Sequence, residues 1–403
     1  MKQEIPPETV VKVVHISDLH ISEQLITSTS NQIKAPHRYG HNYKALSALD
    51  AFLNNNPWDV LVISGDVSRI GSIDSFVWAQ NWIQKKVNIG ASTLGLDLAT
   101  KPNRHYVIVP GNHDRFNGKF IQTSLDDYNN IFPVVRSGKK VPFTFGSITV
   151  NFHVFDSSDS NRSFAKGMID TYDLTSRPIS NDTLDIAVLH HHFIQPPEHE
   201  RERATEITNS QEVASYMLAA GFNGVFFGHT HKSFVDYLPT GLITRMFPSK
   251  GQEATFWKSL MPRRIIERLS DNTTLGYQRE STKDGKYPTI ESYFTYLYIR
   301  DVLGLDVSPP AKFRNVIGFY THLEKFSAVN NLTEEIAKLK QRKILVSMAP
   351  SACQAEAKRN GFHVFDFIFA NNILSKIQPF VYTLEDSQFK LAKQPLSPFV
   401  VQV

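Results

Sequence analysis

The chain has 403 residues, of which 41% are hydrophobic and 20% charged, and its formal net charge is +4 at pH 7. These values describe an ordinary globular protein, long enough for one elaborated domain or for two. No apolar stretch approaches the roughly 20 residues that span a bilayer, the first residues lack a signal-peptide pattern, and Cys353 is the only cysteine. We therefore expect a cytoplasmic protein with no transmembrane segment and no internal disulfide.

Strand-like and helix-like segments alternate over the first 240 residues. The apolar patterns predict strands at 10–16, 60–63, 106–109, 148–155, 185–189 and 224–227, and helices at 42–53, 75–84 and 211–220. The strand-like segments 143–145 and 148–155 flank Gly146 and Ser147, which predicts a hairpin. Strands that alternate with helices are typical of an α/β layered core.

The alternation stops after residue 240. Residues 241–343 hold 17 Lys and Arg against 11 Asp and Glu, a net charge of +6, whereas the rest of the chain has a net charge of −2. Basic, aromatic and turn residues mix in this segment, with helical patterns at 257–269, 293–303 and 332–341. Strand signals return at 344–348, 363–369 and 377–384.

Six of the apolar runs end directly in small clusters of Asp, His or Asn. In chain order these clusters are Asp18 and His20; Gly65 and Asp66; Gly111, Asn112, His113 and Asp114; Asp156; His190, His191 and His192; and Gly228, His229 and His231. A repeated placement of this kind predicts a ring of oxygen and nitrogen groups along one edge of a sheet. We interpret this ring as a metal site.

The kinds of side chain in the ring indicate which metals it suits. Residues two apart at a strand end project to the same side, so the pair Asp18 and His20 can converge on one ion, as can His229 and His231. Carboxylates, an amide oxygen and several imidazoles together suit Mn, Fe, Co or Zn better than Ca or Mg. Seven such ligands are too many for one ion and fit two ions that share a carboxylate. Two ions about 3.5–4 Å apart with a hydroxide between them are a standard device for attack on phosphorus.

Five motifs in this order within the first 231 residues resemble the calcineurin-like metallophosphoesterases. The motifs are Asp18-x-His20, Gly65–Asp66, Gly111–Asn112–His113–Asp114, a strand ending in His190, and Gly228–His229–Thr230–His231. The resemblance implies a four-layer αββα sandwich of two mixed sheets with an inserted subdomain. It also implies two divalent cations, Mn, Fe or Zn. Their implied ligands are Asp18, His20 and His231 for the first ion, Asp66 as the bridge, and Asn112, His190 and His229 for the second.

The resemblance gives roles to two further residues and leaves one choice open. It places His113 beside the phosphate, where the ring stabilises charge or protonates the leaving oxygen, and Asp114 would orient His113 through a hydrogen bond. The run His190–His191–His192 is ambiguous by one position. The apolar residues before it favour His190 as the ligand, and His191 is the second choice.

The resemblance also organises the rest of the chain. The turn Ala349–Pro350–Ser351–Ala352 and the strands around it are similar to the end of the family's fold. We therefore expect a catalytic core at 1–240, an inserted basic and aromatic subdomain or lid at 241–343, and C-terminal strands at 344–403 that complete the core. The inserted segment is either a solvated lid, a surface for an anionic substrate or nucleic acid, or a surface for an anionic membrane.

The expected function is hydrolysis of a phosphodiester of nucleotide type by a hydroxide held between two metal ions. Within the family, Phe155–Asp156–Ser157–Ser158, Gly167, the His190 strand and residues 228–231 look most like the bacterial class III cyclic-nucleotide phosphodiesterases. The alternatives are a phosphomonoesterase, a manganese-dependent nuclease that would bind nucleic acid through 241–343, and a non-catalytic scaffold for a partner. The sequence does not indicate an oligomeric state.

Overall fold

A computed structural model describes most of the segments that carry these motifs. The described residues are 8–22, 41–89, 92–116, 125–132, 137–158, 166–170, 172–174, 183–194, 207–210, 213, 216–217, 221–239, 343–354, 359–392 and 396–401. The chain divides into two compact units, one made of 1–213, 220–237 and 344–403, and the other of 214–219 and 238–343. Nearly all of the second unit, including the helices expected between 257 and 341, lies outside the described residues.

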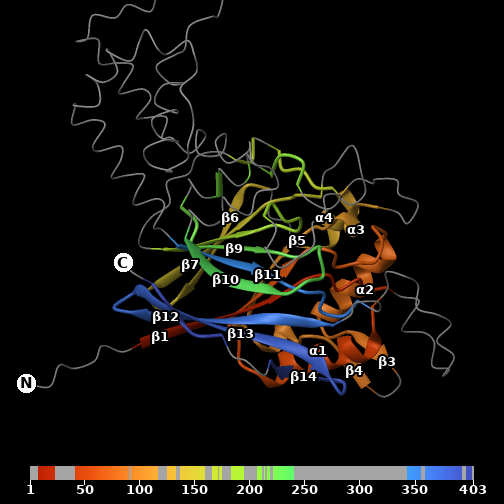
Figure 1. Ribbon diagram of the computed structural model, residues 1–403. Coiled ribbons are helices and arrows are strands. Elements are labelled where there is room, and N and C mark those ends of the chain that lie inside the picture. The colour runs from red at the N-terminus through yellow and green to blue at the C-terminus, as the bar shows by residue number, and fades with distance from the viewer. Residues whose placement is uncertain are drawn as a thin grey trace, which may run out of the picture. The chain divides into compact units, whose positions relative to one another are not determined.

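The first of two β-sheets combines strands from both ends of the chain (Figure 1). Its strand order is β14-β13-β12-β1-β2-β5, and β15 also pairs with β13. Strands β1, β2 and β5 are parallel, whereas β12 runs antiparallel to β1. The bounds are β1 Glu8–Ile16, β2 Val60–Ser64, β5 His105–Val109, β12 Gly361–Ala370, β13 Ile373–Glu385, β14 Gln388–Leu391 and β15 Phe399–Val400.

The second sheet has six strands in the order β10-β11-β9-β8-β7-β6. Strands β7, β8, β9 and β11 are parallel, and β6 pairs with β7 as an antiparallel hairpin across Gly146 and Ser147. The predicted hairpin is therefore confirmed. The bounds are β6 Lys139–Phe145, β7 Ile148–Val154, β8 Leu184–Val188, β9 Gly224–Phe227, β10 Phe234–Pro239 and β11 Lys343–Met348.

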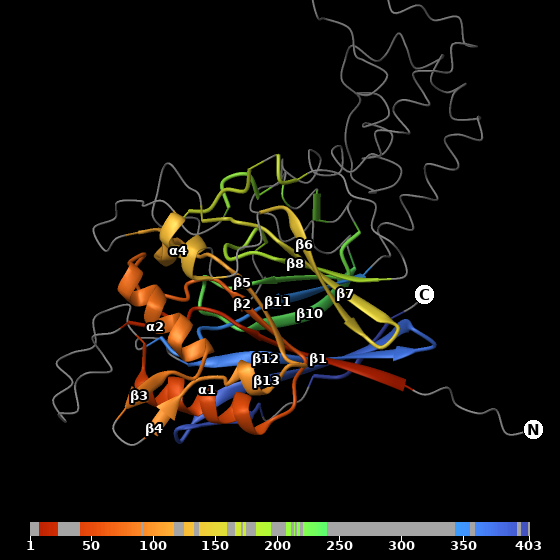
Figure 2. The ribbon, with the colours of Figure 1, turned by 180° about the vertical axis from the view of Figure 1, so that it is seen from behind.

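Helices α1 (Tyr43–Asn55) and α2 (Ile73–Ile83) cover the outer face of the first sheet (Figure 2). The side chain of Asn42 caps α1 by accepting from the backbone N–H groups of Lys44 and Ala45. Ser72 caps α2 in the same way, so this helix begins two residues before its predicted start. The shorter elements are the hairpin β3 Val87–Ile89 and β4 Ser92–Leu94, the 3₁₀ turn η2 Leu98–Thr100, α3 Asn112–Arg115 and α4 Asp126–Ile131.

Strand β1 shows how two cores form from one apolar run. Val11 and Val13 point into the core between the two sheets, whereas Val14 and Ile16 point into the core under α1 and α2. Because successive side chains of a strand alternate between faces, a strand buried on both faces is apolar throughout. The predicted α/β sandwich of two mixed sheets is confirmed.

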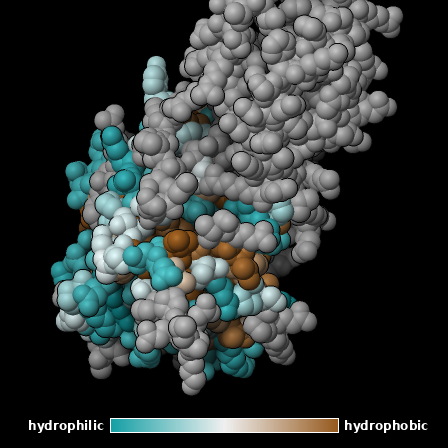
Figure 3. Space-filling view, turned by 90° about the vertical axis from the view of Figure 1, so that its left-hand side faces the viewer, coloured by the Kyte–Doolittle hydropathy of each residue, from teal (hydrophilic) through white to brown (hydrophobic). Residues whose placement is uncertain are grey.

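Two further findings complete the description of the first unit. Figure 3 views it from the side where β1 begins, and apolar residues are exposed there among polar ones. The exposed large hydrophobic residues of the described chain include Val10, Ile373 and Val400, at 46%, 53% and 67%. In the described part of the chain, no helix combines the length and apolarity that crossing a bilayer requires.

Candidate metal centre

The polar clusters meet where the carboxyl ends of β1, β2 and β5 in one sheet approach those of β8 and β9 in the other. Two hydrogen bonds join the sheets there. The Nδ1 atom of His190 donates to the backbone carbonyl of Ser64 at 2.7 Å, and the backbone N–H of His229 donates to Oδ2 of Asp18 at 3.1 Å. The site is therefore assembled from both sheets.

Gly228 permits this close approach. A β carbon at this position would overlap Oγ of Ser17 and would lie 2.7 Å from Oδ2 of Asp18. The absence of a side chain at Gly228 therefore lets the turn after β9 lie directly against the turn after β1.

One group of side chains gathers around Asp18. The Oδ1 atom of this carboxylate lies 3.1 Å from Nε2 of His231 and 3.8 Å from Nε2 of His20. All three residues offer an atom within 4.8 Å of one another, as ligands of one cation must. These are the three residues predicted to hold the first ion.

A second group gathers around His190. Its Nε2 atom lies 3.1 Å from Oδ1 of Asn112, 3.2 Å from Nδ1 of His229 and 3.4 Å from Oδ2 of Asp66. Because Nδ1 of His190 donates to a carbonyl, which can only accept, Nε2 of the neutral ring carries the free electron pair that a metal needs. These are the residues predicted to hold the second ion.

Asp66 lies between the two groups. Its Oδ2 atom is 3.7 Å from Nε2 of His20 and 3.4 Å from Nε2 of His190. Its Oδ1 atom accepts from the backbone N–H of His113 at 2.8 Å, which fixes the carboxylate. All seven predicted ligands are thus brought into one connected cluster, and a carboxylate that could serve two cations is at its centre.

The backbone of the ligand-bearing turns is unusual. Five of the seven predicted ligands have φ between 49° and 71°, in the left-handed region: Asp18, His20, Asp66, His229 and His231. Non-glycine residues adopt this conformation uncommonly, although Asp and His do so more readily than most. Such strain gathers at functional sites, where the surrounding structure holds it in place.

Electrostatic coupling between the groups shifts their pKa values in opposite directions. Burial alone would raise the pKa of Asp66, but the charge of the neighbouring His190 holds it below the usual value. Burial alone would lower the pKa of His190, but Asp66 raises it to about 9. In the same way, the interaction between Asp18 and His231 outweighs burial, so it lowers the pKa of Asp18 and raises the pKa of His231. The His190 and His231 rings thus complement the charges of the carboxylates that they face.

The environment of His20 also indicates that these residues suit divalent cations. His20 is completely buried, yet among the described residues neither of its ring nitrogens has a hydrogen-bond partner. A buried polar atom without a partner is destabilising. One of these nitrogens faces the carboxylates of Asp18 and Asp66 at 3.8 and 3.7 Å, so a cation between them would satisfy all three groups.

The structure changes the expected relation between His113 and Asp114. The family resemblance implies that Asp114 orients His113, but in the structure Nδ1 of His113 donates to the backbone carbonyl of Arg69 at 2.9 Å. Asp114 instead accepts from the backbone N–H groups of Gly111, Val67 and Ser68 at 2.9, 3.2 and 2.8 Å. Its carboxylate therefore ties the turn after β5 to the turn after β2, because both turns present N–H groups that no strand partner uses.

The chemistry open to His113 follows from that contact. Burial lowers the pKa of His113 to about 4 in the metal-free site, so the ring is neutral and Nδ1 carries the proton. The Nε2 atom can then donate to a phosphate oxygen only when the ring gains a second proton. His113 also offers an atom within 4.8 Å of atoms of His20 and Asp66, so it belongs to the same cluster.

Sequence reasoning missed the groups that hold the ligands in place. The carbonyls of Ser64 and Arg69 orient His190 and His113, and the hydroxyl of Ser157 accepts from the backbone N–H groups of His190 and His191 at 3.2 and 3.0 Å. Ser157 belongs to the motif Phe155–Asp156–Ser157–Ser158, so the sequence did contain a sign of its importance. Backbone carbonyls leave no such signal, since every residue has one.

A separate hollow of about 600 Å³ lies at the opposite end of β1 and β5, away from this cluster. Its cations are already engaged. The Arg104 guanidinium stacks on Trp58 at 4.4 Å and donates to the carbonyls of Leu53 and Asn56 at the end of α1. This arrangement stabilises a helix C-terminus, so we do not assign this hollow to the phosphate.

Two mixed sheets that bring buried carboxylate, amide and imidazole groups together at their carboxyl ends define a metal-binding protein of the α/β sandwich class. Residues 11–233 match the family model described as calcineurin-like phosphoesterase. The match covers more than half of the chain, and the chain belongs to this family. Membership supports the predicted general chemistry, the metal-dependent hydrolysis of a phosphoric ester.

Comparison with individual proteins gives more distant likenesses. No curated protein matches the chain. Among solved structures, a single mutant of Vps29 from Entamoeba histolytica shares 9% identity over 96% of this chain and 100% of its own, with a TM-score of 0.34. Vacuolar protein sorting 29 from Cryptosporidium parvum shares 11% identity, covering 97% and 99%, with a TM-score of 0.33. Wild-type Vps29 from Entamoeba histolytica, complexed with zinc, shares 11% identity, covering 95% and 97%, with a TM-score of 0.32.

Proposed function

We propose that this protein hydrolyses a phosphodiester of nucleotide type with two divalent cations, Mn, Fe or Zn. Asp18, His20 and His231 hold the first cation, Asn112, His190 and His229 hold the second, and Asp66 is shared. The observation that carries the proposal is the position of the Asp66 carboxylate, 3.7 Å from His20 Nε2 and 3.4 Å from His190 Nε2. When bound, the cations acidify water and neutralise charge on the phosphoryl oxygens.

The residues around the cations perform the remaining tasks. Asp66 orients His113 by accepting from its backbone N–H, and the Arg69 carbonyl fixes the rotation of its ring. His113 then stabilises the charge on a phosphate oxygen or delivers a proton to the leaving oxygen once its ring is protonated. Asp114 holds together the two turns that carry Asp66 and Asn112.

The preference for a diester, as in the bacterial class III cyclic-nucleotide phosphodiesterases, rests on the motif Phe155–Asp156–Ser157–Ser158 with Gly167. These positions border the second cation group in the structure. Ser157 holds the backbone of His190, and Arg115, at the end of α3, pairs with Asp156 at 2.8 Å. The division into a core at 1–240, an inserted subdomain or lid at 241–343 and completing strands at 344–403 is part of the same proposal.

The test uses two chromogenic esters. The purified full chain, loaded with Mn, should hydrolyse bis-p-nitrophenyl phosphate faster than p-nitrophenyl phosphate, and a 3′,5′-cyclic nucleotide should compete with the diester. The Asn112→Ala variant should lose this activity, because Asn112 supplies an oxygen to the second cation. A faster reaction with the monoester would replace the diesterase proposal by the phosphomonoesterase alternative. Hydrolysis of neither ester would overturn the catalytic proposal.

A further inference from the structure

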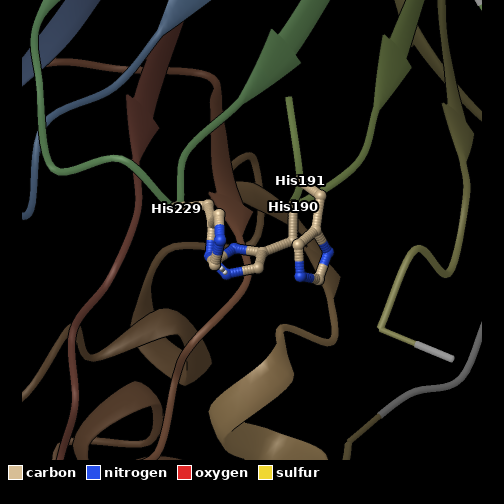
Figure 4. Close-up of side chains that lie close together, drawn as sticks. All are labelled: His190, His191 and His229. Carbon is tan, nitrogen blue, oxygen red and sulfur yellow. Dashed lines mark hydrogen bonds between the residues drawn. The ribbon is translucent and has the colours of Figure 1, made fainter. Parts of the chain in front are cut away.

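His191 is a buried residue of the cluster that the proposed ligand set does not use. It follows His190 directly after β8 and has no solvent-exposed surface. Its ring centroid lies 4.4 Å from that of His229 and 5.0 Å from that of His190. One ring nitrogen of each of the three histidines lies within 4.8 Å of the other two, and Figure 4 shows the three rings together beyond the ends of β8 and β9.

The hydroxyl of Ser157 determines which nitrogen of His191 carries the proton. A serine hydroxyl has one hydrogen to donate and two electron pairs that accept. The two electron pairs of Ser157 are used by the backbone N–H groups of His190 and His191, at 3.2 and 3.0 Å. Its hydrogen is therefore left for the remaining neighbour, Nδ1 of His191, at 3.0 Å.

The two adjacent histidines consequently adopt opposite tautomers. His190 has its proton on Nδ1, which donates to the Ser64 carbonyl, so its Nε2 is free to bind a cation. His191 accepts at Nδ1, so its proton is on Nε2 and that nitrogen is a donor rather than a ligand. These tautomers are inferred from the hydrogen-bond network.

The donor on His191 lacks an acceptor among the residues that the structure describes. Its Nε2 atom is buried and has no hydrogen-bond partner, which is destabilising unless a ligand supplies the acceptor. The ring is also held in place, because a β carbon at Gly167 would lie 2.5 Å from Cγ and 2.6 Å from Nδ1 of His191. Ser157 on one side and the bare backbone of Gly167 on the other thus fix a donor that nothing in the described structure uses.

We propose that His191 donates its Nε2–H to a phosphoryl oxygen of the bound phosphate ester, as a substrate-binding residue beside the second cation group. A phosphoryl oxygen only accepts hydrogen bonds, so it complements a fixed donor. This inference rests on the proposed function, since it takes the ligand of the site to be a phosphate ester. It also settles the choice between the two histidines: His190 holds the cation and His191 binds the substrate.

The experiment separates binding of metal from binding of phosphate. Four variants of the full chain are compared with wild type: His190→Ala, His191→Phe, His191→Gln and, as a matched control, His105→Phe at the other end of β5. Bound Mn per chain is measured by elemental analysis. The Kd of inorganic phosphate for the Mn-loaded protein is measured by titration calorimetry, so the readout does not depend on turnover.

The expected results differ for each variant. His190→Ala should lose Mn from the second group, whereas His191→Phe should keep the Mn content of wild type. His191→Phe should bind phosphate about 10- to 100-fold more weakly, as for a lost hydrogen bond to a charged group. His191→Gln, whose amide can donate from nearly the same position, should recover most of this affinity, and His105→Phe should match wild type. If the phenyl ring is not accommodated, His191→Leu removes the donor with a smaller side chain.

Two outcomes would overturn the inference. Loss of Mn in His191→Phe would make His191 a ligand, and unchanged phosphate affinity in a folded, Mn-loaded variant would make it a packing residue. Either result leaves the proposed function intact if wild type still hydrolyses the diester. Failure of wild type to hydrolyse any ester, with the affinity changes as expected, would instead reject the function and retain the binding role.

Discussion

The turns that carry the metal ligands hold several side chains in a conformation that costs free energy. A non-glycine residue in the left-handed region costs on the order of 1–3 kcal/mol, and Asp18 and His231 are two of five such residues in the cluster. The buried nitrogens of His20 add an unmet hydrogen-bonding need. These costs lie in the residues that a cation would contact, so binding of the cation is what offsets them.

Replacing Asp66 should therefore affect both cations together. We expect Asp66→Ala to lose both metal ions and all hydrolytic activity, because this carboxylate borders both groups. Elemental analysis of the purified variant gives the metal content. The matched control is Asp386→Ala, which changes an exposed carboxylate in the turn between β13 and β14 and should leave two ions bound. Retention of one ion per chain in Asp66→Ala would show that the carboxylate is not shared.

Replacing His113 should affect turnover and not metal content, because the proposed role of His113 is to contact the phosphate. We expect His113→Ala to keep its metal and to slow turnover about 10²- to 10⁴-fold, the usual range for loss of a general acid or of charge stabilisation. The measurements are kcat for the diester and the metal content of the same preparation. Full activity of this variant would remove His113 from the reaction, and loss of metal would make it a ligand.

For single residues, the sequence indicates the candidate ligands better than it indicates the backbone groups that orient them. Asp18, Asn112 and His229 could be selected as candidate ligands because few residue types bind metals and because these residues directly follow strands. The carbonyls that orient His190 and His113 could not, since the chain path alone brings Ser64 and Arg69 to those rings. The hydrogen-bond partners of Asp114 could not be predicted for the same reason, because most of them are backbone N–H groups.

A buried network of hydrogen bonds connects strands of the two sheets close to Asp18. His15 on β1 contacts Oγ of Ser64 on β2 at 2.9 Å and Oγ of Ser347 on β11 at 2.7 Å. Ser347 in turn contacts His363 on β12 at 2.9 Å, and His363 contacts Ser233 at 2.8 Å. His15 therefore joins a strand of the second sheet to the first sheet.

Because His363 is buried in this hydrogen-bond network, we expect the protein to lose stability in mild acid. Burial lowers the pKa of His363 to about 3, whereas the unfolded value is 6.5. Between these values the unfolded state binds a proton that the folded state does not, so stability is full above pH 6.5 and falls as the pH falls toward 3. The contribution of one such histidine at pH 5 is about 2 kcal/mol.

The measurement is urea unfolding of metal-free wild type and His363→Gln at pH 7 and pH 5. Glutamine does not titrate, so the variant should lose about 2 kcal/mol less stability than wild type between these two pH values. An equal loss in both proteins would show that His363 is not held neutral by the fold.

The turn after β9 gives a prediction about packing. Gly228→Ala should displace Asp18 or Ser17, because the added methyl group would overlap the turn after β1. We expect a loss of about 1–3 kcal/mol in stability together with weaker metal binding, measured by thermal unfolding and elemental analysis. The control is Gly146→Ala, also a turn glycine, where a β carbon meets nothing within 4 Å. That variant should keep its metal and lose only the cost of its φ of +62°.

Strands and helices were predicted correctly where they are buried, because burial requires apolar residues in a regular pattern. Strands β2 and β8 are buried along their whole length and read as apolar runs, and α1 has a regular apolar face. Strands β10 and β14 were not predicted because few of their residues are fully buried. An element at the margin of a sheet is specified by its backbone pairing more than by its side chains.

For the whole molecule, the metal centre joins the two sheets, so its cations should stabilise the fold. A ligand at 100 times its Kd stabilises the folded state by about 2.7 kcal/mol. Removal of metal with EDTA should therefore lower the thermal midpoint by about 5–10 °C. Differential scanning calorimetry with and without EDTA gives the shift. Asp66→Ala is the control, because a protein that binds no metal should not respond to EDTA.

Sheet order is the part of the fold that the sequence reveals least. The parallel strands follow chain order in places, yet β12 lies beside β1, and β11 lies between β9 and β10. The pairing of β1 with β12 joins residues that are more than 300 positions apart, as in Val11 and Phe367. Local patterns cannot specify such pairings, because they depend on which remote strand completes the core.

The pairing of β1 with β12 has a consequence for biosynthesis. Strand β1 is synthesised more than 300 residues before its antiparallel neighbour, residues 361–370. Until then one margin of the nascent central strand presents unpaired amide and carbonyl groups, which are prone to aggregation. The first sheet is therefore completed only after residues 361–370 have been synthesised, so the β1 margin stays open while most of the core is being made.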